Sequence, residues 1–230
     1  MIVAIKYTAE EKKKIDAFEA LPDEEVKGYW EKTHDGELSE LKERIKSHYL
    51  EAQNYTCPYC RQRIEVNHKA AWDAEHIIPK DTHPRFMFEA KNLCISCKDC
   101  NQSKWNQNVL VNERRKTFPD FNGDYLISHP HFDDYEADIK IIALAAFYLP
   151  KTEKGRKTVE ICGLLRFLYK FADYDCTSDD VDKKIGALYS ELMEAKDPAQ
   201  RHFLLLAIAA VANDGAKKQM EQAMAKRFAN

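Results

Sequence analysis

Two pairs of cysteines with the same spacing constrain this chain more than any other feature. Cys57 and Cys60 form one Cys-x-x-Cys pair, and Cys97 and Cys100 form the other. A two-residue spacing lets both sulfurs of a pair reach one metal ion, and four thiolates complete a closed tetrahedral zinc site. The cysteine count of seven is odd, which argues against a disulfide framework. We therefore predict a structural Zn²⁺ that clamps the two pairs together, in preference to a redox pair.

Length and composition are those of a globular protein. The chain has 230 residues, of which 44% are hydrophobic and 32% charged, so it can bury a core and stay in solution. No apolar run approaches the roughly 20 residues that cross a bilayer, and the first residues do not resemble a signal peptide. We expect a cytoplasmic protein that makes no membrane contact.

Charge is distributed unevenly along the chain. The net charge is −3, but residues 1–41 carry −5, residues 42–118 carry +5 and residues 119–230 carry −3. The basic segment contains both cysteine pairs, as a phosphate-binding surface requires. We divide the chain into an N-terminal helical segment (1–53), a central module (54–118) and a mainly helical C-terminal region (119–230).

Apolar spacing predicts helices on both sides of the central module. The N-terminal segment should hold helices over 9–20 and 37–53. The C-terminal region should hold helices over 157–169, 179–195 and 198–212, followed by a last amphipathic helix after residue 215. Residues 125–134 read as a strand and a turn, whereas 141–148 could be strand or helix.

The central module has a different pattern. Residues 74–79 read as a strand that a proline ends, 80–91 as a loop, 92–96 as a second strand, and Cys97 begins a helix. The expected fold class is therefore α+β, mainly helical, with a small strand-loop-strand-helix module embedded between N- and C-terminal helices.

Side chains suited to phosphodiester hydrolysis lie within this module. Hydrolysis needs a base that deprotonates water and a cation on the phosphate oxygens. His76 on the first strand is the candidate base, and Glu75 and Asn101 offer the oxygen ligands that Mg²⁺ or Mn²⁺ prefers. Lys104, one helical turn after Asn101, is expected to neutralise charge on the phosphate. Asn92 is placed to bond the loop backbone and so orient His76.

This ordered set resembles the zinc-stapled form of the HNH (ββα-metal) endonuclease motif. The resemblance covers residues 57–104 and rests on Cys57-x-x-Cys60, Glu75-His76-Ile77-Ile78-Pro79, Asn92-Leu93 and Cys97-x-x-Cys100-Asn101-x-x-Lys104. It implies the same roles for His76, Asn92 and Asn101. One departure is Glu75, where the family more often has aspartate, so Asp73 on the same strand face is a further candidate ligand.

The flanks of the module carry a second resemblance. The runs Tyr125-Leu126-Ile127-x-His129-Pro130-x-Phe132-Asp133 and Lys157-Thr158-Val159-Glu160 are similar to HNH proteins encoded beside an ATPase in phage-defence operons, of the Septu and retron types. This implies a defence effector with an ATPase partner, and docking surfaces for that partner in the acidic N-terminal and helical C-terminal parts.

The function that the sequence favours is a metal-dependent HNH endonuclease that cleaves nucleic acid, with DNA favoured over RNA such as tRNA. The alternative from another class is a non-catalytic zinc module that binds nucleic acid or protein. A purely structural clip would not need Glu75, His76, Asn101 and Lys104, which argues against this alternative.

Other conspicuous residues have simpler explanations. We expect Cys94, Cys162 and Cys176 to be small buried hydrophobic residues. His129 and His131 are expected in a turn with satisfied polar groups. The aromatic residues near the module are expected in the core or an interface instead of stacking on bases: Tyr29, Trp30, Trp72 and Trp105.

Overall fold

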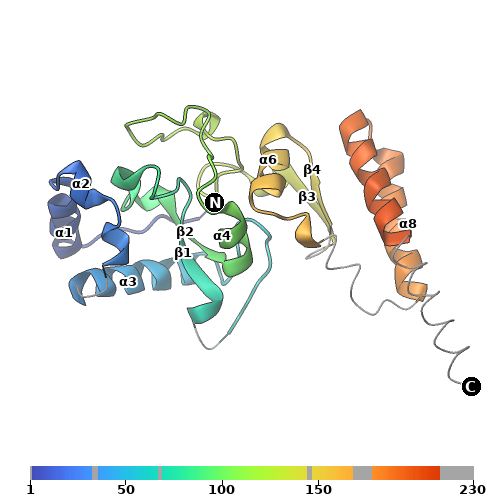
Figure 1. Cartoon of the computed structure of the whole chain (residues 1–230). Helices are drawn as coiled ribbons and strands as arrows, with labels where there is room; N and C mark the ends of the chain where they lie inside the picture. Colours follow the sequence, from blue (N-terminus) through green and yellow to red (C-terminus); the bar gives the residue numbers. More distant parts are fainter. Residues whose placement is uncertain (1, 33–35, 67–68, 144–146, 168–177, 213–230) are drawn as a thin grey trace, which may run out of the picture.

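The computed structural model describes residues 2–32, 36–66, 69–143, 147–167 and 178–212. Within these ranges helices surround two small antiparallel sheets, which confirms the predicted α+β, mainly helical class. Figure 1 shows the N-terminal helices at one end and α8 at the other, with the two sheets between them. The helix expected after residue 215, and Cys176, lie outside the described residues.

Three helices and one 3₁₀ turn form the N-terminal end. They are α1 (Ala9–Glu19), α2 (Asp23–Val26), η1 (Tyr29–Glu31) and α3 (Gly36–Ala52), so both predicted helices are confirmed. α1 starts at a capping box in which Thr8 and Glu11 each bond the backbone N–H of the other. Apolar residues at helical spacing in α3, including Leu41 and Ile45, are buried in the core.

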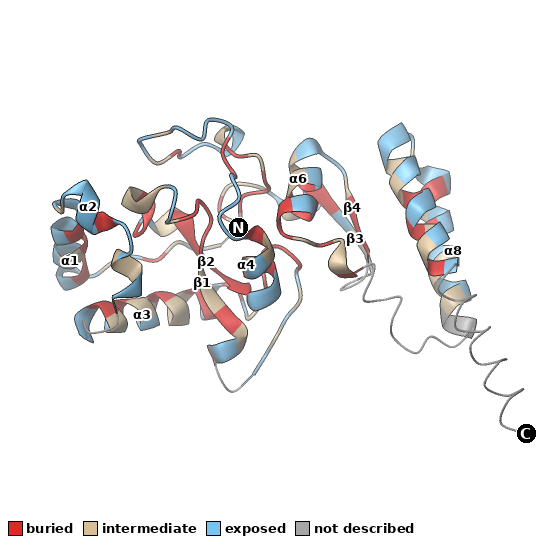
Figure 2. Cartoon of the chain, viewed as in Figure 1, coloured by how far each residue is buried: buried red, intermediate tan, exposed pale blue. Residues whose placement is uncertain are grey.

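The central sheet pairs β1 (Trp72–His76) with β2 (Leu93–Cys97), and α4 (Lys98–Lys104) follows β2 directly. The predicted order of strand, loop, strand and helix is therefore present, with short 3₁₀ turns η2 (Lys69–Ala71), η3 (Pro84–Phe86) and η4 (Ala90–Asn92) around it. β1 ends before Pro79 because the Ile78 N–H bonds the Asn92 side chain (2.7 Å) and not a neighbouring strand. Figure 2 shows that both strands are largely buried.

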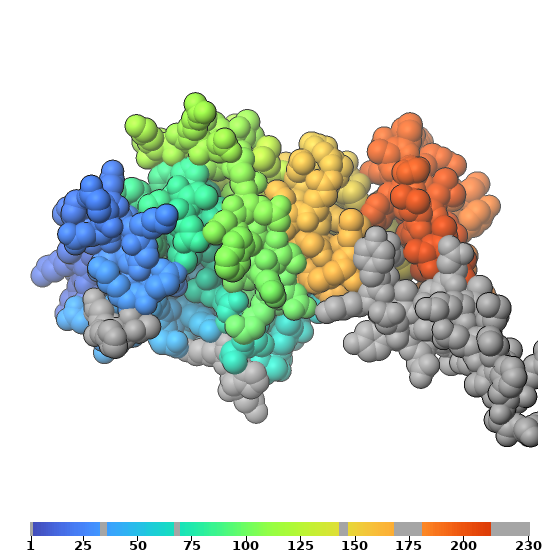
Figure 3. Space-filling model, in the orientation of Figure 1, coloured from blue at the N-terminus to red at the C-terminus, as the bar shows by residue number. Residues whose placement is uncertain are grey.

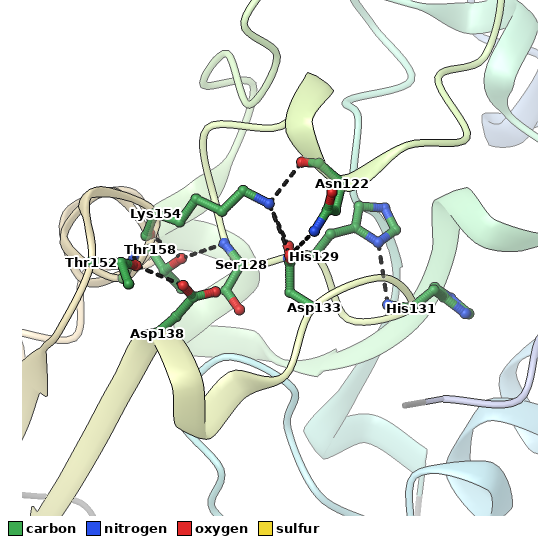
Figure 4. A network of polar contacts seen from close by, with 10 residues as sticks. Asn122, Ser128, His129, His131, Asp133, Asp138, Thr152, Lys154 and Thr158 are labelled. Carbon is green, nitrogen blue, oxygen red and sulfur yellow. Dashed lines mark hydrogen bonds and ion pairs between the residues drawn. The ribbon is translucent and has the colours of Figure 1, made fainter.

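Residues 105–138 are mostly irregular. Of the strand and turn expected over 125–134, the turn is present, because the Phe132 and Asp133 N–H groups donate to the His129 carbonyl. The strand is absent: Tyr125 forms only an isolated bridge with Leu110, and the turn η5 (Asn122–Asp124) precedes it. Polar contacts hold this region in place of a ladder (Figure 4). Lys154 reaches the Asp133 carboxylate (2.7 Å), and the His131 N–H donates to Nδ1 of His129 (3.2 Å).

A second hairpin begins the C-terminal end. It pairs β3 (Ile139–Ala143) with β4 (Phe147–Pro150), so the strand alternative for residues 141–148 is confirmed where the structure describes them. The helices beside it are α5 (Tyr135–Asp138), α6 (Glu153–Ile161), α8 (Ser178–Glu194) and a helix over 198–212. α6 ends earlier than predicted because Gly163 adopts a left-handed conformation (φ 62°) that stops it.

The second hairpin separates two hydrophobic cores. The main core extends from Ile5 to Phe167 and includes Tyr148, and the smaller one joins Phe147 and Leu149 to α8 and the 198–212 helix. Successive residues of a strand point to opposite faces, so β4 contributes to both cores. Among the described helices, none combines the length and apolar character needed to cross a lipid bilayer.

Candidate functional site

The four paired cysteines converge at one buried point. Their sulfurs lie within 4.8 Å of one another, and Sγ of Cys60 is 3.8 Å from Sγ of Cys97. A tetrahedron with Zn–S bonds of 2.3 Å has an S–S edge of about 3.8 Å. The cluster therefore has the donors, the number and the spacing that a structural zinc requires.

Local backbone geometry presents these thiols. The Cys57–Cys60 knuckle is closed by the Arg61 N–H, which donates to the Cys57 carbonyl (2.9 Å), and Arg61 itself has a positive φ of 59°. Cys97 ends β2 and stands before the first residue of α4, so Cys100 in the first turn of that helix comes back beside it.

Arg166, from the segment after α6, also reaches the cluster. One of its terminal nitrogens lies 3.1 Å from Sγ of Cys100, and the other donates to the carbonyls of Cys162 and Gly163. A guanidinium at this place offsets part of the negative charge of four thiolates. Sequence reasoning missed Arg166 because it lies 66 residues from its sulfur partner.

His76 is the last residue of β1 and is 5% exposed. Its Nε2 is 3.1 Å from the Met87 carbonyl, which can only accept, so Nε2 carries the proton and Nδ1 keeps its lone pair. Nδ1 has no hydrogen-bond partner among the described residues, and it keeps some contact with solvent. The Trp30 ring packs edge-on against the imidazole at 4.6 Å between centroids.

Burial keeps His76 neutral. Loss of solvent is the main cause that lowers the pKa of His76 to about 3, and the positive charges of Lys80 and Lys104 add to it. The imidazole is therefore unprotonated at neutral pH, so it can accept a proton, although the same burial lowers its strength as a base.

Asn92 fastens the loop that holds His76. Its Oδ1 accepts from the Ile78 N–H (2.7 Å), and its Nδ2 donates to the carbonyls of Ile78 (3.2 Å) and Phe86 (3.0 Å). Because Phe86 precedes Met87, these bonds place the carbonyl that orients the imidazole. The contacts have the form that the predicted loop-fixing role requires.

Glu75 and Lys104 form an ion pair inside the protein. Nζ of Lys104 lies 2.7 Å from the Glu75 carboxylate and donates to the His76 carbonyl (2.9 Å), and the two side chains are only 4% and 1% exposed. The Tyr59 hydroxyl donates to the same carboxylate (3.1 Å). Burial raises the pKa of Glu75, although Lys104 and Tyr59 both act in the opposite direction. Lys104 is thus buried against Glu75, and its predicted role in neutralising charge on a phosphate stays a prediction.

A cleft of about 400 Å³ opens beside this pair, lined by Asp73, Glu75, His76 and Asn101 among others. Nδ2 of Asn101 donates to one Asp73 carboxylate oxygen (3.0 Å), and Lys98 donates to the other (2.9 Å). Asp73 is partly exposed, whereas Glu75 is 3% exposed and engaged by a lysine. Of the predicted ligands for a catalytic cation, Asp73 and Asn101 therefore have oxygens nearest to solvent, and hard oxygen donors suit Mg²⁺ or Mn²⁺.

Three further residues of the site were missed by sequence reasoning. The Tyr59 hydroxyl donates to Glu75, the Trp30 ring packs against His76, and the Met87 carbonyl accepts from His76. Each contact is made between segments that are distant in sequence, so no local pattern signals it.

Comparisons with known proteins give one partial match. The chain is similar to the Septu protein PtuB of Bacillus thuringiensis, with 41% identity over 63 residues. The similarity covers 27% of this chain and 24% of that protein, so the match spans about a quarter of the length of each. No protein-family model matches the chain, and no solved structure matches it.

Proposed function

We propose that this chain is a metal-dependent endonuclease of the HNH type that hydrolyses phosphodiester bonds in nucleic acid, with DNA favoured. The observation that carries the proposal is the state of His76. Its imidazole is neutral, held by the Met87 carbonyl through Nε2, and has Nδ1 free at a cleft that also contains Asp73 and Asn101.

In this proposal His76 takes a proton from water at Nδ1. The bond from Nε2 to Met87 stabilises the imidazolium that forms, because a carbonyl oxygen accepts more strongly from a charged donor. Asn92 keeps that carbonyl in place, and the Glu75–Lys104 pair fixes the His76 backbone. All three residues act by positioning the base.

Asp73 and Asn101 are the proposed ligands of a catalytic Mg²⁺ or Mn²⁺, with Glu75 as the second candidate carboxylate. A divalent ion would supply positive charge to the phosphate oxygens. Its binding would compete with the contact between Lys98 and Asp73, which is solvent-exposed and therefore weak. The four-cysteine cluster is the proposed site of a separate, structural Zn²⁺.

We further propose that the protein acts in anti-phage defence with an ATPase partner. The partial similarity to a Septu protein supports this role. Apolar side chains exposed on α8 and the 198–212 helix, namely Tyr189, Met193, Leu205 and Leu206, support the C-terminal end as the docking surface.

A cleavage assay tests the nuclease. Wild-type protein and His76→Ala are incubated with plasmid DNA, single-stranded DNA or total tRNA, in Mg²⁺, Mn²⁺ or EDTA. We expect cleavage that requires the divalent ion and is lost in His76→Ala, while zinc content stays the same. His83→Ala is the matched control, since His83 lies in the neighbouring loop and does not line the cleft.

The substrate that disappears separates DNA from RNA cleavage. Full activity of His76→Ala would refute the assignment of the base. If neither the chain alone nor the chain with its ATPase cleaves any of the three substrates, the non-catalytic zinc module becomes the better description.

A further inference from the structure

Trp105 is exposed to solvent, unlike the other tryptophans. It is 70% exposed, whereas Trp72 is 1% exposed and Trp30 packs against the core. Of the two places expected for Trp105, the core or an interface, its exposure excludes the core. It lies directly after α4 and lines the cleft that also contains His76 and Asp73. Figure 3 shows the segment that includes α4 at the surface, in the middle of the viewed face.

The backbone holds Trp105 in an unusual conformation. Its φ of 42° and ψ of −131° lie outside the regions that a bulky residue ordinarily adopts, and such strain persists only where the surrounding structure imposes it. The Trp105 N–H donates to the Asn101 carbonyl (2.8 Å), and the preceding Lys104 is anchored on the buried Glu75. The next residue, Asn106, donates to Asp81 (2.8 Å).

The indole itself has no partner among the described residues. No aromatic ring, cation or hydrogen-bond acceptor of the described residues contacts it, although the side chains of both its neighbours in the chain are hydrogen-bonded. Strained residues that the structure holds in place are concentrated at functional sites. The side chains that share the cleft with Trp105 are mostly polar or charged, including Lys98, Gln102 and Asn106.

We propose that Trp105 is a stacking platform for an unpaired nucleobase, next to the phosphate that the cleft receives. This rests on the proposed nuclease function and specifies its substrate as single-stranded nucleic acid or a nucleotide extruded from a duplex. An aromatic face attracts any base, but bases inside a duplex already stack on their neighbours. The polar surroundings favour this ligand over a protein partner, whose contact would continue into an apolar patch.

Binding without cleavage tests the platform. A fluorescein-labelled 12-nucleotide single strand and the matching duplex are titrated into the full chain carrying His76→Ala, without added divalent ions, and binding is followed by anisotropy. Adding Trp105→Ala should weaken single-strand binding about 5- to 150-fold and leave duplex binding unchanged. Adding Phe121→Ala, which removes an aromatic side chain that is 66% exposed outside the cleft, should change neither.

Intrinsic fluorescence gives a second readout. An unlabelled single strand should quench the tryptophan emission, and Trp105→Phe should abolish the quenching while retaining most of the affinity. The proposal is overturned if Trp105→Ala binds the single strand as tightly as its parent, if quenching persists in Trp105→Phe, or if the parent does not bind it at low salt.

Cleavage assays separate this result from the fate of the nuclease. Binding that depends on Trp105 without any cleavage would refute only the nuclease, and cleavage with binding independent of Trp105 would refute only the platform.

Discussion

The ion pair between Glu75 and Lys104 is a costly feature at the scale of single residues. Both side chains are removed from water, and their attraction offsets that cost only while both partners are present. Because Lys104 also bonds the His76 carbonyl, the pair joins α4 to the end of β1 where the candidate base lies.

We therefore expect Lys104→Ala to lower the free energy of unfolding by about 3–5 kcal/mol, since it leaves a buried carboxylate without its cation. Urea unfolding measures the loss. The control is Lys98→Ala, which breaks the exposed contact with Asp73 and should cost less than about 1 kcal/mol. Similar small losses in the two variants would contradict the structural role of Lys104.

A second prediction concerns His129, which is fully buried. Burial is the main cause that lowers the pKa of His129 well below its usual range, with added repulsion from His131, Lys154 and Lys91. The folded protein keeps this ring neutral at acidic pH, whereas the unfolded chain protonates it near pH 6.5. Its contribution to stability is thus present above about pH 6.5 and is lost as the pH falls, by up to roughly 1.4 kcal/mol per unit.

The variant His129→Phe removes the group that takes up this proton in the unfolded chain. We expect its free energy of unfolding, measured between pH 4 and pH 8, to fall less steeply with acid than that of the wild type. Parallel curves for the two proteins would show that His129 does not titrate in this way.

At the scale of elements, the cysteine cluster joins three parts of the chain. The knuckle after α3 and the junction of β2 and α4 supply the thiols, and the segment after α6 supplies Arg166. Zinc would therefore stabilise contacts between elements that are distant in the sequence.

We expect Arg166→Met to remain folded and to lose zinc to a chelator several-fold faster than the wild type, because the thiolate charge is no longer offset. Release is followed with a zinc-sensitive dye. Arg156→Met is the matched control, since Arg156 pairs with Glu153 and Glu160 on the surface of α6, far from the thiols in sequence. Cys97→Ser, which removes a ligand, should lose zinc and soluble protein together. Equal release rates for Arg166→Met and the wild type would exclude Arg166 from the zinc site.

At the scale of the whole molecule, two cores meet at one hairpin. The smaller core is built from β4, α8 and the 198–212 helix, and the module with the cleft belongs to the larger one. Regions with separate cores can open separately.

We expect Leu204→Ala to increase amide exchange in α8 and the 198–212 helix while β1, β2 and α4 keep their protection. Leu204 is fully buried, and its truncation costs about 2–5 kcal/mol. Hydrogen exchange followed by mass spectrometry measures the exchange of each segment. The control is Leu206→Ala, because Leu206 is 56% exposed. Faster exchange throughout the chain would indicate a single cooperative unit.

The sequence alone determined the features that depend on spacing along the chain. The two cysteine pairs predicted the four-sulfur cluster, and the apolar periods predicted α1, α3 and α8 to within about two residues. The order of β1, β2 and α4 also followed from local patterns. These features depend on short-range geometry, which a few neighbouring residues specify.

The tertiary structure decided which side chains face water. Lys104 and Asn101 lie three residues apart on one helix, yet one is buried on Glu75 and the other lines the cleft. Trp105 is exposed although its type favours burial, and residues 125–134 form the predicted turn without the predicted strand. The burial of each side chain depends on segments that are distant in sequence, because packing determines which groups lose their water. Burial in turn sets the pKa of His76 and decides which candidate cation ligands reach the cleft.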